Sequence, residues 1–222
     1  MAIAHEDLAI TAGGVVLYGD LRVPDHATGI VVFAHGSGSS RRSTRNAHVA
    51  AHLRRQHLGT LLFDLLTAPE EADDARFRAY RFDIVLLARR LIETTDWLLQ
   101  QPGIPPLLGL FGASTGAAAA LVAAAERPDA VAAVVSRGGR PDLAGDAVLE
   151  RVRAPTLLIV GGADNVVLDL NERAAQRLQC EKEVIVIPGA THLFEETGAL
   201  DTVTRCAAQW FVQYLAPLDP NR

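Results

Sequence analysis

A serine, an aspartate and a histidine follow one another along the chain in an order that suits acyl-transfer chemistry. Residues 112–116 read GASTG, a G-x-S-x-G pattern centred on Ser114; Asp164 comes next, and His192 is the only histidine after Ser114. A serine hydroxyl is a poor nucleophile near neutral pH, so it needs a general base, and the base needs an acid to orient it. We predict Ser114 as the nucleophile, His192 as the base and Asp164 as the orienting acid.

The surroundings of Ser114 fit the turn that such a nucleophile requires. The apolar run at residues 107–111 predicts a strand, and the alanine-rich residues 115–126 predict a helix. G-x-S-x-G between a strand and a helix is typical of a sharp turn that exposes the serine, with the helix N-terminus pointing at the site. A side chain at position 112 or 116 would collide with the neighbouring helix or strand, which explains the glycines.

The acid has several candidates. Asp164 follows Gly161 and Gly162 at the end of a predicted strand, so its loop can aim it back at the sheet. Asp169 is expected in the first turn of a helix, where a carboxylate favours the helix dipole. Asp142 and Asp146 remain as further alternatives, and we favour Asp164.

A turn rich in small residues could supply an oxyanion hole. The predicted strand at residues 30–34 runs into residues 35–40, HGSGSS. The backbone N–H of Ser37 and that of Thr115, the residue after the nucleophile, are the expected donors. His35 is expected to order this turn and not to act as the base.

Arg137 admits two interpretations. It follows a predicted strand, so it could face the same edge as Ser114 and bind a substrate carboxylate through its guanidinium. Alternatively, it is a loop arginine paired with Asp142 or with a backbone carbonyl, which we consider the more common case. A comparison of neutral and acidic esters would decide between them.

The elements that must position these residues alternate between strand and helix patterns. Fully apolar strand-like runs are typical of a parallel sheet covered on both faces, and strand–helix alternation predicts an α/β doubly wound sheet. Gly13 and Gly14 separate the first two strands and predict a hairpin. The eight expected strands are residues 5–10, 15–23, 30–34, 60–63, 107–111, 131–135, 156–160 and 184–187. The six expected helices are residues 45–57, 82–100, 115–126, 142–152, 168–178 and 200–215.

One long segment, residues 64–81, lacks a clear pattern and is rich in acidic residues. It is either a surface loop with a short helix or part of the rim of a site. Because acidic side chains usually face solvent, we favour a solvated loop here.

Composition narrows the classes of function. The 222 residues suit a single domain covering residues 1–222, and a net charge of −5 argues against a nucleic-acid partner. Neither a signal peptide nor an apolar run long enough for a membrane span is visible, so we expect a cytoplasmic protein without a membrane partner. Cys180 and Cys206 do not make a disulfide framework. Arg41 stands where the third glycine of G-x-G-x-x-G would be, and no P-loop occurs, so neither a dinucleotide nor an NTP is expected. Because the predicted triad needs neither a metal nor a cofactor, we expect none.

Taken together, the chain resembles the α/β-hydrolases over nearly its full length. Finer features resemble the bacterial dienelactone hydrolase-like group, namely residues 63–67 (FDLLT), 135–142 (VSRGGRPD) and 189–195 (GATHLFE). The resemblance implies hydrolysis of carboxylic esters or lactones through an acyl-enzyme. Some relatives in that group carry a fused phosphoribosyltransferase domain, for which these residues leave no room. Dienelactone hydrolases proper use a cysteine where this chain has Ser114, so their substrate does not carry over.

Other functions remain as alternatives. The same triad could serve a thioesterase or an acyltransferase, and a hydrolase fold can also be a binding protein without catalysis. A short-chain dehydrogenase is disfavoured because its glycine-rich loop normally follows the first strand. About six residues after the strand at 131–135 leave no room for a helical cap, so we expect an open site for a small ester or lactone. The oligomeric state stays open between a monomer and a homodimer.

Overall fold

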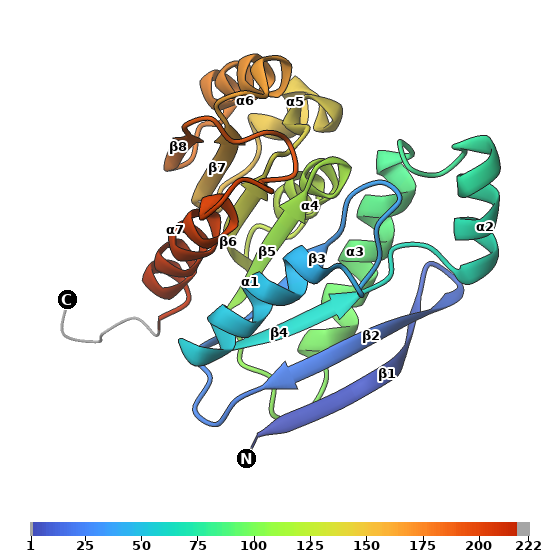
Figure 1. Ribbon diagram of the computed structural model, residues 1–222. Helices are drawn as coiled ribbons and strands as arrows, with labels where there is room; N and C mark the ends of the chain where they lie inside the picture. The colour runs from blue at the N-terminus through green and yellow to red at the C-terminus, as the bar shows by residue number, and fades with distance from the viewer. Residues whose placement is uncertain (1, 217–222) are drawn as a thin grey trace.

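The protein is an α/β fold built on one eight-stranded sheet. The structure, a computed structural model, describes residues 2–216. The strands lie in the order β1-β2-β4-β3-β5-β6-β7-β8 (Figure 1). Their bounds are β1 Ile3–Ala12, β2 Val15–Val23, β3 Gly29–Ala34, β4 Leu58–Phe63, β5 Leu108–Ala113, β6 Val131–Arg137, β7 Thr156–Gly161 and β8 Lys182–Ile187.

The sheet is mostly parallel, as the apolar strand runs predicted. β3 pairs in parallel with β4 and β5, and the parallel pairing continues through β6, β7 and β8. β1 and β2 form the predicted antiparallel hairpin, and β2 joins it to β4. Gly13 and Gly14 make the hairpin turn with φ of 64° and 75°, a region that glycine enters without steric cost.

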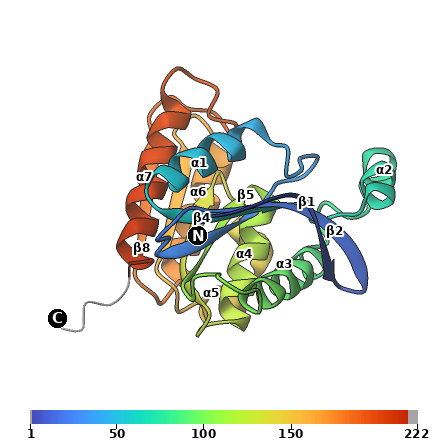
Figure 2. The same ribbon diagram turned by 90° about the horizontal axis from the view of Figure 1, so that it is seen from below.

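Helices cover both faces of the sheet and bury its apolar side chains. One core lies under α1 and α7, and the other under α3, α4, α5 and α6 together with the hairpin. Figure 2 shows α1 and α7 on one side of the sheet and α3 and α4 on the other. The bounds are α1 Thr44–Arg55, α2 Ala68–Phe77, α3 Ile84–Leu99, α4 Thr115–Glu126, α5 Asp146–Leu149, α6 Asn165–Arg177 and α7 Ala199–Tyr214.

The helix expected at residues 142–152 is wrong in extent. A 3-10 turn, η1 (Pro141–Ala144), and the short α5 stand there instead. Gly145 separates them with φ of 84° and ψ of 148°, which no helix can accommodate. The prediction of one continuous helix did not take into account that Gly145 could end a helix.

The acidic segment at residues 64–81 contains an additional helix, α2, so the described residues hold seven α-helices and not six. Thr67 and Glu70 form a capping box at its start, with each side chain bonded to the other residue's backbone N–H. Glu70 is also bound bidentately by the buried Arg90 of α3, at 2.6 and 2.7 Å. The favoured prediction, a solvated loop, is therefore only partly correct. α2 stands away from the sheet (Figure 2), but the contact between Glu70 and Arg90 fixes it to α3.

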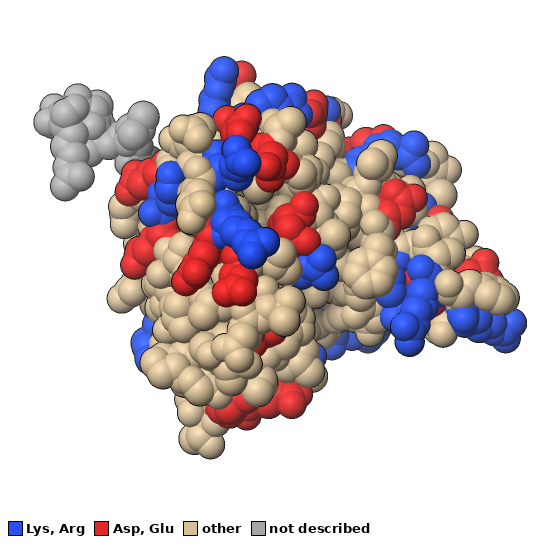
Figure 3. Space-filling model, turned by 90° about the horizontal axis from the view of Figure 1, so that it is seen from above, with Lys and Arg blue, Asp and Glu red and all other residues tan. Residues whose placement is uncertain are grey.

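The topology brings four loops to one edge of the sheet. β3, β5, β7 and β8 are parallel, so the turns after their carboxyl ends all lie at that edge, where α/β sheets bind ligands. As expected, no cap is inserted after β6, because η1 begins four residues beyond its end. Basic and acidic side chains are interspersed on the face seen from above (Figure 3). Within residues 2–216, no helix is long and apolar enough to cross a membrane.

Candidate active site

Ser114 occupies the sharp turn between β5 and α4. Its φ is 51° and its ψ is −120°, a conformation that costs a non-glycine residue about 1–3 kcal/mol. The neighbouring strand braces this turn: the Ser114 N–H donates to the Arg137 carbonyl at 3.3 Å, and the Ser114 carbonyl accepts from the Arg140 N–H at 3.0 Å. The strain at Ser114 is therefore held in place by β6 and the loop after it.

The two glycines of the pattern are required by close packing, as predicted. A Cβ at Gly112 would lie 2.3 Å from the Cα of Ala117 in α4. A Cβ at Gly116 would lie 2.2 Å from the carbonyl oxygen of Ala34 in β3. Both neighbours are backbone atoms, which cannot move aside without shifting the helix or the strand.

Asp164 and His192 meet across the turns that follow β7 and β8. His192 Nδ1 lies 2.7 Å from Asp164 Oδ2. The carboxylate is largely buried, with 17% of its side chain exposed, whereas the imidazole is 39% exposed. A carboxylate on Nδ1 fixes the ring and leaves Nε2 available as a base, which is the arrangement expected from the sequence.

Among the described residues, Asp164 is the acid that bonds to His192. The three alternative acids are engaged elsewhere or exposed: Asp142 is bound by Arg140, Asp146 pairs with Arg177, and Asp169 is exposed on α6.

The loop after β6 connects the serine to the histidine. A Cβ at Gly138 would lie 3.1 Å from the His192 carbonyl oxygen and 3.5 Å from the His192 Nδ1. Arg137 and Arg140, which flank the two glycines of this loop, both hydrogen-bond to the Ser114 backbone. Within residues 2–216, however, the Ser114 hydroxyl makes no hydrogen bond, so the link from Ser114 to His192 is not closed. Such bonds often tighten only when substrate is bound.

The turn after β3 places the two expected oxyanion donors together. The hydroxyls of Ser37 and Thr115 are 3.1 Å apart, and a Cβ at Gly36 would lie 3.0 Å from the Ser114 Cβ. Among the described residues, neither the Ser37 N–H nor the Thr115 N–H donates to another group. Two free N–H groups beside the serine are what an oxyanion hole needs.

His35 is buried and orders this turn, as expected. Its Nε2 accepts the Leu65 N–H at 3.0 Å, so its Nδ1 carries the proton and donates to the Gly36 carbonyl at 3.0 Å. Burial lowers the pKa of His35, and the opposing effects of the Gly36 carbonyl and Asp64 are smaller. A neutral imidazole whose two nitrogens are both hydrogen-bonded is suited to holding a loop and not to proton transfer.

A cavity of about 300 Å³ lies beside the two donors. Ser37 and Thr115 line it together with other residues of the turn after β3. It is also lined by residues from α2, α3 and the segments around α2, namely Leu65, Leu66, Glu71, Asp74, Ala75, Arg81 and Leu87. All of them except Leu87 lie in the segment 64–81, for which the sequence left two interpretations open, a surface loop and the rim of a site. The solvated loop was favoured because an acidic helix without an apolar stripe gives no sign of the partner it faces.

Two carboxyl groups of this cavity differ in their electrostatics. Burial would raise the pKa of Asp74, but hydrogen bonds from the N–H groups of Tyr80 and Arg81 and from the Arg81 guanidinium bring it below its ordinary value. Burial raises the pKa of Glu71, and the nearby Asp64 adds to the rise. Glu71 is thus the cavity carboxyl that is more readily protonated.

Arg137 ends β6 as a buried cation. It is 8% exposed, and within residues 2–216 its Nε and Nη1 have no hydrogen-bond partner. Burial lowers its pKa to about 10, and the nearby Arg45 contributes. Arg140, not Arg137, holds Asp142. Among the described residues, no group of three or more His, Cys, Asp or Glu side chains is arranged to hold a metal ion.

Comparison with known proteins agrees with the fold described above. A family model described as an alpha/beta hydrolase domain matches residues 27–213. The crystal structure of a dienelactone hydrolase from Anabaena variabilis is 55% identical, with a TM-score of 0.92 over 96% of this chain and 98% of that one. Est1E from Butyrivibrio proteoclasticus, with ferulic acid bound, shares the fold at 15% identity and a TM-score of 0.79, over 95% of this chain and all of that one.

A curated relative from Mycobacterium tuberculosis (strain H37Rv) is 56% identical over 220 residues, or 99% of this chain. It carries the provisional name phosphoribosyl transferase. The chain spans about half the length of this relative, 48%.

Proposed function

The chain belongs to the alpha/beta hydrolase domain family, and from this premise we propose that it is a serine hydrolase of small carboxylic esters or lactones. The observation that carries the proposal is the 2.7 Å bond between Asp164 and His192, at the same sheet edge as the positive-φ Ser114. A binding protein would not need a strained serine at the same sheet edge as an oriented imidazole.

In the first half of the proposed reaction, Ser114 Oγ attacks the ester carbonyl carbon and His192 Nε2 takes the hydroxyl proton. Asp164 stabilises the imidazolium, and the N–H groups of Ser37 and Thr115 bind the oxyanion. When the tetrahedral intermediate collapses, the bond to the leaving alkoxide breaks and His192 returns the proton to it. The alcohol leaves, and the acyl group remains on Ser114.

In the second half, water replaces the alcohol. His192 takes a proton from the water while the oxygen attacks the acyl carbon, and the same two N–H groups bind the second oxyanion. Collapse breaks the bond to Ser114 Oγ, which recovers its proton from His192. The products are the carboxylic acid and the free enzyme, so the cycle needs no cofactor.

The test is hydrolysis of p-nitrophenyl acetate and butyrate by the wild type and the Ser114→Ala and His192→Ala variants. We expect both variants to lose at least about 1,000-fold in kcat, because the triad acts as a unit. The control is His48→Ala, at an exposed histidine on α1, which should keep wild-type activity. Wild-type turnover by Ser114→Ala would contradict the proposal.

Arg137 is proposed as the contact for an anionic group of the substrate. Its support is the buried guanidinium without a hydrogen-bond partner among residues 2–216, since a buried cation lacks the compensation that an anion would supply. Its backbone bond to Ser114 puts it at the end of the strand beside the nucleophile.

Arg137→Lys tests this role with two esters that differ only in a terminal carboxylate. We expect the variant to raise KM for the acidic ester by about 10-fold or more and to leave the neutral ester little changed, because a lysine cannot form the bidentate contact. Equal losses with both esters would contradict an anion contact.

A further inference from the structure

Two hydrogen bonds, which we call the clasp, hold the two ends of the turn that carries Ser37. The turn, residues 36–40, begins after His35 and ends before Arg41. At the first end, His35 Nε2 accepts the Leu65 N–H at 3.0 Å. At the second end, the Arg41 N–H donates to Asp64 Oδ1 at 2.8 Å. Two consecutive residues, Asp64 and Leu65, thus bind the chain on both sides of the turn.

The clasp is fixed to the sheet. Asp64 directly follows β4, and its N–H donates to the carbonyl of Tyr18 in β2 at 2.9 Å. The Asp64 carboxylate also binds the Arg41 guanidinium through its second oxygen. Both side chains are largely buried, at 14% and 10% exposed, so solvent screens this pair only weakly.

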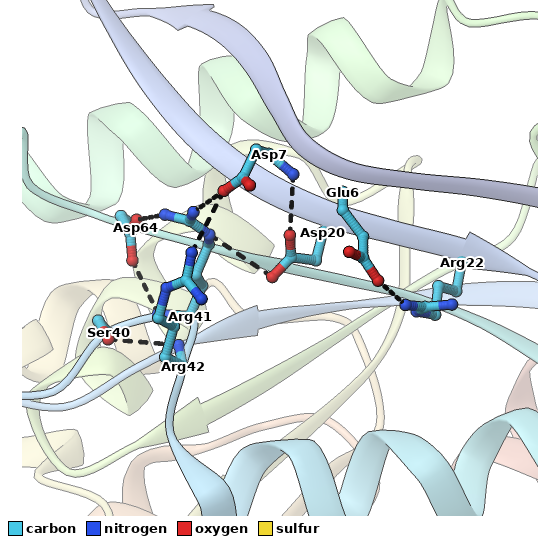
Figure 4. Close-up of polar contacts among 8 residues, drawn as sticks. All are labelled: Glu6, Asp7, Asp20, Arg22, Ser40, Arg41, Arg42 and Asp64. Carbon is cyan, nitrogen blue, oxygen red and sulfur yellow. Dashed lines mark hydrogen bonds and ion pairs between the residues drawn. The ribbon is translucent and has the colours of Figure 1, made fainter.

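Arg41 also reaches the hairpin. Figure 4 shows its guanidinium between three carboxylates: that of Asp64, that of Asp7 in β1 and that of Asp20 in β2. One carboxylate suffices to neutralise the charge, but only Asp64 also binds the Arg41 backbone. Of the contacts between Arg41 and these carboxylates, the bond from its N–H to Asp64 is therefore the one that fixes the backbone at the second end of the turn.

From these contacts, and on the basis of the proposed hydrolase function, we propose that Asp64 and Arg41 are positioning residues. They hold the Ser37 N–H at the place where the oxyanion develops. Ser37 itself has few restraints: its hydroxyl contacts Thr115 at 3.1 Å and donates to the Arg81 carbonyl at 3.3 Å. A donor must lie within a few tenths of an ångström of its place to stabilise the transition state, so a released turn should cost turnover more than substrate binding.

The test compares Asp64→Ala and Asp64→Asn with the matched control Asp20→Ala. Asp20 contacts the same guanidinium but no backbone group of the turn. We expect Asp64→Ala to lower kcat for p-nitrophenyl butyrate at least about 10-fold with KM within about 2-fold. Asp64→Asn keeps an oxygen for the Arg41 N–H and should recover part of the loss. Asp20→Ala should keep the wild-type kcat.

A second readout separates positioning from a merely structural role. Ser114 adds to the carbonyl carbon of a trifluoromethyl ketone, and the resulting hemiketal carries the oxyanion. The inhibition constant of this ketone should therefore rise in proportion to the loss in kcat. The affinity for the carboxylic acid product, which carries no such oxyanion, should not change. If Asp64→Ala does not fold, as judged by circular dichroism, the same comparison is made with Asp64→Asn and Arg41→Lys.

The outcomes are distinct. Variants at Asp64 that keep wild-type kcat and inhibitor affinity, in an enzyme that still depends on Ser114, would overturn the clasp and leave the proposed function intact. Losses confined to thermal stability would also overturn it. Hydrolysis that does not depend on Ser114 would overturn the proposed function, and the clasp with it.

Discussion

Ser114 shows how much of this site depends on single residues. Its positive φ is possible because Gly112 and Gly116 leave room for the chain on either side. The steric role of both glycines was predicted correctly, because G-x-S-x-G between a strand and a helix implies a sharp turn with no room for side chains at these positions. Asp164 was favoured for a similar local reason, the Gly-Gly turn before it.

Gly116→Ala is predicted to damage both stability and activity. The new Cβ would lie 2.2 Å from the Ala34 carbonyl, which is backbone, and overpacking of this kind typically costs about 1–3 kcal/mol. Gly59→Ala in β4 is the control, since its Cβ would meet the side chain of Ile30 at 3.2 Å. Urea unfolding and ester hydrolysis measure the two effects; equal losses in both variants would contradict the steric account.

His35 is predicted to make stability depend on pH. Burial lowers its pKa below the ordinary 6.5, so the unfolded chain binds the proton more readily than the folded one. The stabilisation is fully present above about pH 6.5 and is lost as the pH falls through the lower pKa of the folded state.

The measurement compares urea midpoints of the wild type and His35→Gln between about pH 8 and 5. The wild type should lose more stability than His35→Gln as the pH falls, whereas the exposed His5→Gln should follow the wild type. Parallel pH profiles for the wild type and His35→Gln would rule out this role of His35.

At the scale of elements, prediction from sequence succeeded where one pattern dominated. Apolar runs predicted the six strands β3 to β8, and the Gly-Gly turn predicted the hairpin of β1 and β2. Alanine-rich residues predicted α4 with the bounds Thr115–Glu126. It failed where long-range contacts decide. α2 has no apolar stripe, and the contact that holds it, Glu70 with Arg90, spans twenty residues. For the same reason, the segment with the cavity residues Glu71 and Asp74 was favoured as a solvated loop, and the rim of a site was kept only as the alternative.

Glu70→Ala is predicted to destabilise the protein by about 3–5 kcal/mol at pH 7, because it leaves the buried Arg90 without its partner. Asp96→Ala is the control. Asp96 lies on α3, as Arg90 does, and forms an ion pair with Arg127. Because the side chains of Asp96 and Arg127 are both more than a third exposed, we expect Asp96→Ala to lower the free energy of unfolding by only about 0–1 kcal/mol.

The effect of Glu70 should vanish in acid. The Arg90 hydrogen bond, opposed by burial, lowers the pKa of Glu70 to about 2. The carboxylate therefore stabilises the fold above its ordinary pKa of 4.5, and this stabilisation is lost as the pH falls toward about 2. Chemical unfolding at several pH values should show the difference between the wild type and Glu70→Ala narrowing below about pH 4.5. A constant difference would contradict the ion pair.

At the scale of the whole molecule, the fold leaves the proposed site open. The chain passes from β6 to η1 without a cap, and α2 is the element that borders the cavity beside Ser37. A cavity of about 300 Å³ suits a small acyl or alcohol group better than a long lipid chain.

Substrate preference should follow from this shape. In a panel of p-nitrophenyl esters, we expect kcat/KM to be highest for acetate to butyrate and to fall with longer chains. We also expect no jump in rate when a long-chain ester passes its critical micelle concentration, because no cap is present to open at an interface. A preference for long chains, or interfacial activation, would contradict an open site.

The most direct test of the account is covalent labelling of the nucleophile. The wild type is treated with a fluorophosphonate, and the modified residue is located by peptide mass spectrometry. We predict a single adduct, on Ser114, that is absent from Ser114→Ala and much slower to form in His192→Ala, because the imidazole activates the hydroxyl. A wild type that stays unlabelled, or an adduct on another residue, would contradict the assignment of Ser114 as the nucleophile.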